Sequence, residues 1–325
     1  MRNQRLFSVI RGYIGMEENI LVNKDFEGMR LDAFVVSVLP FFSRSRVKKL
    51  IDSGSILVDG GKKKVSFRLR ENNSVTVSFV EDAHILRPYP FKVDIIYEDE
   101  DVIVVNKPEN LTVHPPNRNC QNTLVNALLY MGKELSLPGT LRRGIVHRLD
   151  RETSGVMVIA KNDFSHSLLV EQFKKRRIKK EYRAIVWGII KKDSVTVNLP
   201  LKRDRRNRLK MRVSMFNSKE AFTNIEVLRR FENSTYIRVI LLTGRMHQIR
   251  VHMNFLDHPI LGDNKYGKKD SVGHLFLHSF KLGFYHPRTD KYMEFKAPLP
   301  EWFTAWNKAE LRSGKTNKSM NDKNA

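Results

Sequence analysis

The chain has 325 residues, of which 41% are hydrophobic and 29% charged, a balance typical of a globular protein and not of a disordered one. An excess of lysine and arginine gives a formal net charge of +23 and a pI near 10.1, which favours a polyanionic partner, above all nucleic acid. No apolar run reaches the roughly 18 residues that span a bilayer, a secretory signal pattern is missing, and a lone Cys120 suits a reducing compartment, so we expect a cytoplasmic protein.

Residues 1–20 are expected to be a flexible basic lead-in, with Met16 as an alternative start. Residues 21–82 are expected to form a small unit. Its residues 28–40 carry apolar side chains at helical spacing, and a second helix is expected over 44–54, with Ser43 as N-cap and Gly54 as its end. Strands are expected within 55–60 and 75–80. Lysines and arginines cover the second helix, which predicts a binding surface for polyanions.

Two prolines predict a linker over residues 83–92, and residues 93–312 show no second break. This larger part alternates strand-like runs (101–108, 155–160, 181–190 and 234–244) with helical ones (123–132 and 165–176). The succession of strands near 220–245 indicates an α+β domain with a mainly antiparallel, mixed sheet. The polar tail, residues 313–325, is expected to be disordered.

Two segments, residues 174–183 and 202–212, are dense in lysine and arginine. A single run of this kind is usually a solvated face. Two such runs beside a basic small unit favour nucleic acid, because phosphates relieve the repulsion between clustered cations. Charge alone does not separate RNA from DNA.

A charged turn, residues 147–154, joins two apolar runs and contains Asp150 between Arg148 and Arg151. An aspartate in such a turn commonly caps local N–H groups. Here the neighbouring arginines would keep the carboxylate ionised, so it could also attack the anomeric carbon of a sugar or act as a base. Glu152 is a possible second carboxylate for glycosidase-like hydrolysis, although its position equally fits solvent exposure.

Five of the six histidines in the last third of the chain raise the question of a metal site: His247, His252, His258, His274 and His278. Their spacing does not match a metal-binding helix, and no cysteine cluster accompanies them. We expect structural or RNA-contacting histidines and no metal.

The charged turn, HRLDRETSG, resembles the central motif of the RluA-type pseudouridine synthases, which isomerise uridine in ribosomal or transfer RNA. Residues 101–115, 179–188, 241–253, 258–267 and 274–287 resemble further motifs of that family in the same order, although Ser279 stands where alanine is more usual. Residues 28–60 resemble the RNA-binding domain first known in ribosomal small-subunit protein four. The resemblance implies a pseudouridine synthase fold for residues 93–312, with base flipping and without a cofactor.

By this resemblance Asp150 is the catalytic group and Tyr182 the active-site tyrosine, whose ring would stack on the uracil. Arg148 is expected to enter the RNA beside the displaced base. Arg245, at the start of a helix, is expected to bridge to Asp150 and keep it ionised.

Two further residues complete the expected site. Leu277 is expected to pack beneath the pocket, and Lys107 to support the site or contact the RNA backbone.

The leading hypothesis is therefore a monomeric pseudouridine synthase acting on large-subunit (23S-type) rRNA, with tRNA as another possible substrate. Two alternatives remain open from the sequence. One is a non-catalytic RNA-binding protein of ribosome assembly on the same fold, and the other is an N-glycosidase that would release free uracil.

Overall fold

The computed structural model describes residues 6–10, 13–39, 44–82, 86–117, 119–136, 141–267, 272–306 and 309. The chain divides into two compact units, the first built mainly from the residues up to Arg87 and the second mainly from those beyond it.

The first unit is a four-stranded antiparallel sheet of order β1-β2-β4-β3 with two helices. Its elements are β1 (Leu6–Ile10), β2 (Tyr13–Leu21), a 3-10 turn (Lys24–Phe26), α1 (Leu31–Val38), α2 (Arg44–Ser53), β3 (Ile56–Val58) and β4 (Ser74–Asp82). Phe34 of α1 and Val47 of α2 are fully buried in one core with Val58 and Val75 of the sheet. The helical periodicity of the sequence therefore identified the faces that cover the strands.

Within the first unit, the expected flexible lead-in contains two strands. Strand β2 pairs with β4 along its whole length, from Tyr13 opposite Asp82 to Leu21 opposite Ser74. Backbone pairing over nine residues satisfies the amide groups of the segment, which a free lead-in would leave to water. Helix α2 ends at Ser53, and the φ of +81° at the following Gly54 suits the glycine that was expected to stop it. Ser43, part of the expected linker (83–85) and the tail 313–325 lie outside the described residues.

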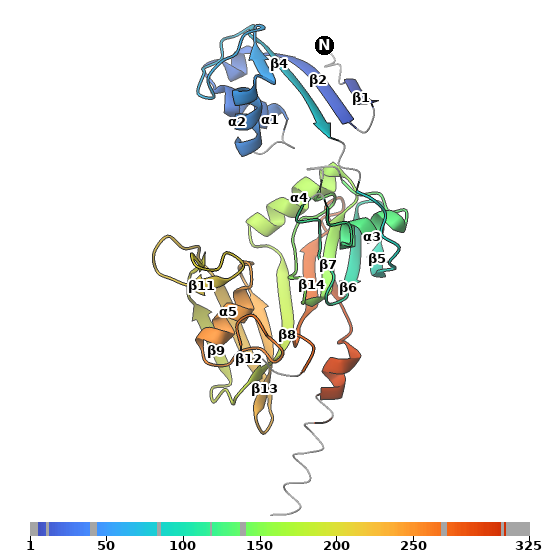
Figure 1. Ribbon diagram of the computed structural model, residues 1–325, viewed down its shortest axis with the longest axis vertical. Helices are drawn as coiled ribbons and strands as arrows, with labels where there is room; N and C mark the ends of the chain where they lie inside the picture. The colour runs from blue at the N-terminus through green and yellow to red at the C-terminus, as the bar shows by residue number, and fades with distance from the viewer. Residues whose placement is uncertain are drawn as a thin grey trace, which may run out of the picture. The chain divides into compact units, whose positions relative to one another are not determined.

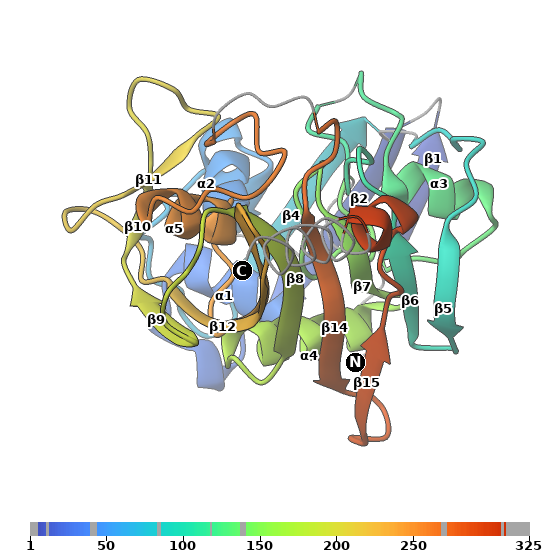
Figure 2. The ribbon, with the colours of Figure 1, turned by 90° about the horizontal axis from the view of Figure 1, so that it is seen from below.

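The second unit contains a nine-stranded mixed sheet, which confirms the expected α+β class (Figures 1 and 2). Its order is β5-β6-β7-β14-β8-β13-β12-β9, and β15 also pairs with β14. The strands are β5 (Asp94–Glu98), β6 (Val102–Lys107), β7 (Ser154–Ala160), β8 (Lys179–Trp187), β9 (Ser194–Asn198), β12 (Phe222–Arg230), β13 (Ser234–Leu241), β14 (Leu277–Tyr285) and β15 (Tyr292–Lys296). All pairs are antiparallel except β7 with β14.

The parallel contact between β7 and β14 depends on a glycine. Gly155 has a φ of +116°, and a Cβ atom at this position would lie 2.2 Å from the carbonyl oxygen of Ser279. The missing side chain therefore lets the two backbones meet directly after the charged turn.

The helices of this unit are α3 (Leu124–Tyr130), α4 (Asp163–Lys174) and α5 (Gln248–Phe255), and residues 301–306 are helical as well. Helix α4 lies alongside β7 and contributes Leu169 to a core with Val156 and Val158, whereas α5 lies alongside β12 (Figure 1). The side chain of Gln248 in α5 donates to the carbonyl oxygen of Phe222. Polar anchoring of this kind fixes the end of α5 that faces the charged turn.

The two basic runs occupy neighbouring parts of the second unit. Residues 174–183 form the end of α4 and the start of β8, and residues 202–212 include the hairpin of β10 (Leu201–Arg203) and β11 (Met211–Val213). Five of the ten residues in the first run and seven of the eleven in the second are exposed, which leaves cations accessible to a polyanion.

Candidate active site

The charged turn, β8, the segment before α5 and the first residue of β14 converge on one cavity. Its lining comprises Arg148, Leu149, Asp150, Thr153, Tyr182, Leu241, Gly244, Arg245, His247, Gln248, Ile249, Arg250 and Leu277. Five of the six residues that the sequence singled out as a site thus lie around one cavity. The sixth, Lys107, does not line it.

Asp150 lies in the turn that leads into β7, and its carbonyl oxygen accepts the N–H of Thr153 at 3.1 Å. Its side chain is 16% exposed. The carboxylate oxygen Oδ2 lies 3.6 Å from Nη1 of Arg250 and 3.9 Å from Nε2 of His247. The acid is therefore withdrawn from bulk solvent and faces positive or hydrogen-bonding groups.

Arg250 organises the carboxylates around the cavity. Its guanidinium bonds Asp263 through two contacts of 2.7 and 2.8 Å, and Nη1 lies 3.3 Å from Glu152. Burial opposes the charged form, but the hydrogen bonds and charge of Asp263 outweigh it, with Asp150 and Glu152 adding to them, so the pKa of Arg250 is raised. Arg250 is thus a permanent cation that lies between three acids.

Tyr182 lies in β8, is 8% exposed, and lines the cavity together with Asp150. Burial raises the pKa of Tyr182 to about 12; a hydrogen bond with Ser279 opposes this rise and the charge of Asp150 adds to it. The side chain is therefore a neutral phenol whose ring can lie against a base but which is a poor proton acceptor.

Arg245 lies at the cavity but does not have the partner expected for it. Its Nε donates to the carbonyl oxygen of Glu220 at 2.9 Å, and its own N–H donates to Gln248 Oε1. Among the described residues, Arg250 is the arginine within ion-pair distance of Asp150. The backbone carbonyl of Glu220 holds the Arg245 guanidinium away from the acid, which explains the difference.

A second cation, Lys180, lies beside the segment that carries Arg245. Nζ of Lys180 donates to the carbonyl oxygen of Thr243 at 3.2 Å. Burial and the charges of Arg176 and Arg245 lower the pKa of Lys180 to about 8. These two cations are suited to a phosphate group.

Of the remaining expected residues, Arg148 is exposed at the cavity and Leu277 is 3% exposed in its wall. Lys107 is fully buried, and its Nζ donates to the carbonyl oxygens of Pro108, Leu111 and Arg151 at 2.7, 2.9 and 3.2 Å. A buried ammonium cannot contact an RNA backbone, so that part of the expectation is wrong. Lys107 instead ties the charged turn to the loop after β6.

Arg148 and Arg151 were expected to hold the acid ionised, but neither forms an ion pair with Asp150 among the described residues. Nε of Arg151 lies 3.3 Å from the carbonyl oxygen of Asn110, and Arg148 is exposed. Among the described residues, the groups within ion-pair distance of Asp150 are those of Arg250 and His247, which lie about a hundred residues further along the chain. The available signal for Arg250 was a charged residue between the apolar Ile249 and Val251.

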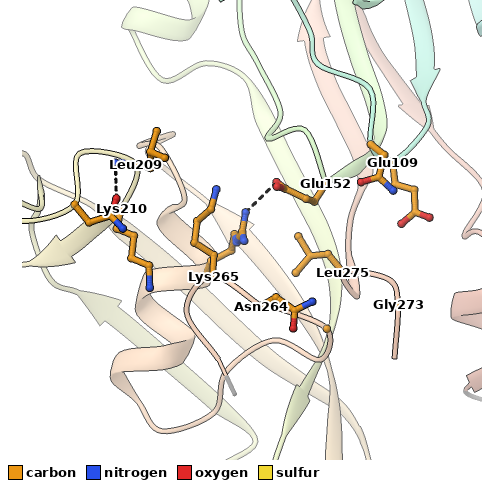
Figure 3. A pocket seen from close by; sticks show the side chains of 12 residues that line it. Glu109, Glu152, Leu209, Lys210, Asn264, Lys265, Gly273 and Leu275 are labelled. Atoms are coloured by element: carbon orange, nitrogen blue, oxygen red, sulfur yellow. Dashed lines mark hydrogen bonds and ion pairs between the residues drawn. The ribbon is translucent and has the colours of Figure 1, made fainter. Parts of the chain in front are cut away.

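A larger cavity of about 460 Å³ adjoins the first, and Glu152 and Arg250 contribute to its lining (Figure 3). Lys210 and Lys265 lie on the side opposite Glu109 in this view, and a dashed line marks the contact of Glu152 with a guanidinium. Such an arrangement offers both cations and acceptors beside the candidate acid.

The histidines serve hydrogen bonding within the fold. His252 contacts Thr223 and the carbonyl oxygen of Leu199, and His278 contacts Ser154 and the carbonyl oxygen of Ala297. Across the described residues, no three histidine, cysteine or acidic side chains are grouped as a metal site. None of the helices among the residues that the structure describes has the length and apolarity needed to cross a membrane.

Comparison with known proteins gives two family matches. The sequence profile of RNA pseudouridylate synthases matches residues 101–255, and that of the S4 domain matches residues 29–75. An uncharacterized RNA pseudouridine synthase of Bacillus subtilis is 40% identical over 87% of this chain and 94% of its own length. Ribosomal large subunit pseudouridine synthase D of Neisseria meningitidis is 41% identical over 87% of this chain and 79% of its own length.

Solved structures show the same relationship. The human RNA pseudouridylate synthase domain containing 1 protein has a TM-score of 0.55 and 28% identity, over 64% of this chain and 84% of the other. Its human domain containing 4 counterpart has a TM-score of 0.51 and 28% identity, over 65% and 90% of the two chains.

Proposed function

This chain belongs to the RNA pseudouridylate synthase family, and on that premise we propose that it isomerises uridine in large-subunit ribosomal RNA with Asp150 as the catalytic carboxylate. It is an RNA pseudouridine synthase with an S4 domain before the synthase part. The observation that carries the catalytic assignment is the convergence of Asp150, Tyr182 and Leu277 on one cavity.

The reaction needs an ionised carboxylate and consumes nothing. The bond between the sugar carbon C1′ and N1 of uracil breaks, the base turns, a bond forms from C1′ to C5, and the proton leaves C5 while N1 becomes protonated. Asp150 can serve as a nucleophile at C1′ or as a base toward the adjacent sugar proton. Arg250 and His247 lie beside the carboxylate on which either route depends.

The base must leave its stack to reach this acid, because the Asp150 side chain is only 16% exposed within a cavity. Unstacking costs a few kcal/mol. The ring of Tyr182 offers a stacking surface worth about 1–3 kcal/mol, and Leu277 supplies an apolar wall. Contacts with these two side chains therefore offset part of the free energy of unstacking. The exposed Arg148 lies where a side chain could enter the space that the base leaves.

The choice of large-subunit rRNA over tRNA is supported by the substrate named for the Neisseria relative and by the basic S4 domain. We place the protein in the cytoplasm, where ribosome assembly supplies this substrate, and propose that it acts as a monomer.

The test is pseudouridine mapping in total RNA from cells with and without the gene, followed by complementation with the wild-type chain or with Asp150→Asn. We expect specific large-subunit rRNA positions to lose pseudouridine without the gene and to regain it only with the wild type. Purified Asp150→Asn should bind the same RNA within about twofold of the wild type, because the substitution keeps the shape of the side chain. Isomerisation by this variant would contradict the assignment of Asp150, and release of free uracil would indicate an N-glycosidase.

A further inference from the structure

His247 immediately precedes α5 and has an unusual backbone conformation. Its φ of +55° lies in the left-handed region, which a residue other than glycine adopts at an energetic cost. Its side chain is nevertheless directed inward, and the residue is only 9% exposed. Such a conformation persists only where the surrounding structure requires it.

One imidazole nitrogen, Nδ1, lies against the hydroxyl group of Tyr266. The Tyr266 hydroxyl oxygen accepts the N–H of Met211 at 2.7 Å and lies 2.7 Å from Nδ1 of His247. The hydroxyl group also has one proton, which it can donate to Nδ1 at this distance. When the hydroxyl donates in this way, Nδ1 accepts and the proton of a neutral imidazole is on Nε2.

The other nitrogen, Nε2, faces the candidate catalytic acid at 3.9 Å from Asp150 Oδ2. Arg250 lies 3.6 Å from the same oxygen, but its guanidinium already makes two short bonds with Asp263 and a contact with Glu152. No other acceptor for His247 Nε2 is found among the described residues, so its N–H is the donor that remains for Asp150.

The burial of His247 favours this neutral form. Burial lowers the pKa of His247; the carboxylates of Asp150 and Glu152 oppose this shift, and the cations Arg250 and Lys265 add to it. A neutral imidazole carries one proton, so its tautomer decides whether Asp150 meets a donor or a lone pair.

We propose that His247 is a positioning residue that donates its Nε2–H to the Asp150 carboxylate, and that Tyr266 selects the tautomer required for this bond. The proposal rests on the proposed role of Asp150. The present separation exceeds a hydrogen bond, and catalytic hydrogen bonds commonly tighten when the substrate enters. Met211 connects this pair to β11, so the hairpin that carries the second basic run supports the same tautomer.

A pair of substitutions separates donation at Nε2 from the other contacts. The amide nitrogen of His247→Gln reaches the position of Nε2 and can donate to Asp150, whereas the amide of His247→Asn reaches only the position of Nδ1. Asparagine is the better residue for a left-handed backbone, so the comparison works against a purely conformational explanation. Single-turnover isomerisation of rRNA from cells lacking the gene is measured at saturating enzyme, together with the RNA Kd.

We expect His247→Asn to lose about 30-fold in the single-turnover rate, which is the scale of a lost charge-assisted hydrogen bond. His247→Gln should stay within about fivefold of the wild type, and the RNA Kd of both should be unchanged within about twofold. Equal losses in the two variants, or a wild-type rate in His247→Asn, would refute donation from Nε2. Asp150→Asn is measured alongside, and its activity would refute the proposed function instead.

Tyr266→Phe tests the selection of the tautomer. It removes only the hydroxyl, and we expect a loss of about fivefold in the wild-type background but none in the His247→Asn background. Equal losses in both backgrounds would contradict the link to His247. Nitrogen-15 NMR of the wild-type imidazole observes the tautomer without any substitution: a proton on Nε2 supports the proposal, and a proton on Nδ1 overturns it.

Discussion

Replacing Arg250 by methionine should destabilise the second unit by about 3–5 kcal/mol, because it leaves a buried acid without its partner. The Asp263 side chain has no exposed surface and accepts two bonds from the guanidinium, at 2.7 and 2.8 Å. Each such charge-assisted bond contributes about 1.5–3 kcal/mol. Glu152 is 36% exposed and adds less than about 1 kcal/mol. The free energy of unfolding is measured by urea titration with a probe in the synthase unit.

Two matched variants sharpen this measurement. Arg176→Met removes an arginine that pairs with Glu220 on the surface, and it should cost less than about 1 kcal/mol. Adding Asp263→Asn to Arg250→Met removes the uncompensated charge while keeping an oxygen for the N–H groups of Lys265 and Tyr266, so part of the stability should return. A loss below about 1 kcal/mol for Arg250→Met, or no recovery in the double variant, would refute the reasoning.

Three further predictions use other parts of the site. Burial lowers the pKa of Lys107 to about 7, so the unfolded chain binds more protons than the folded one between about pH 7 and 10. The free energy of unfolding should therefore rise with pH over this range. Lys107→Met should flatten that slope in urea titrations at several pH values. Gly155→Ala should lower the melting temperature by several degrees or prevent folding, because its Cβ would lie 2.2 Å from the Ser279 oxygen, and a wild-type melting curve would contradict the close approach. Tyr182→Leu should lower kcat/KM on rRNA by about 5- to 100-fold through lost stacking. Tyr182→Phe keeps the ring and should bind RNA like the wild type. An equal loss of kcat/KM in the two variants would exclude the ring as the important group.

Much of the fold follows from local sequence patterns. The apolar periodicity of α1 and the continuous apolar run of β7 are visible in the sequence, since each depends on residues close together in the chain. Strand β2 was missed because its pairing with β4 spans about 60 residues. In addition, Glu18 occupies a buried position in β2 and interrupts the apolar alternation that marks a strand.

The candidate site shows the same division between local and distant information. The turn around Asp150 could be identified, because its charged residues are consecutive. The partner of this acid could not be assigned, since Arg245 and Arg250 are five residues apart and only the position of α5 decides which guanidinium faces inward. The roles of Lys107 and His247 depend on contacts with backbone or hydroxyl groups, which leave no pattern in the order of side chains.

The place of β14 in the sheet constrains when this enzyme can become active during its own synthesis. Residues 277–285 lie between β7 and β8, which emerge from the ribosome roughly a hundred residues earlier. Until they arrive, both neighbours expose unpaired backbone edges, which are prone to join other chains. A nascent or truncated polypeptide that ends before Leu277 therefore lacks both the middle of its sheet and a wall of the cavity.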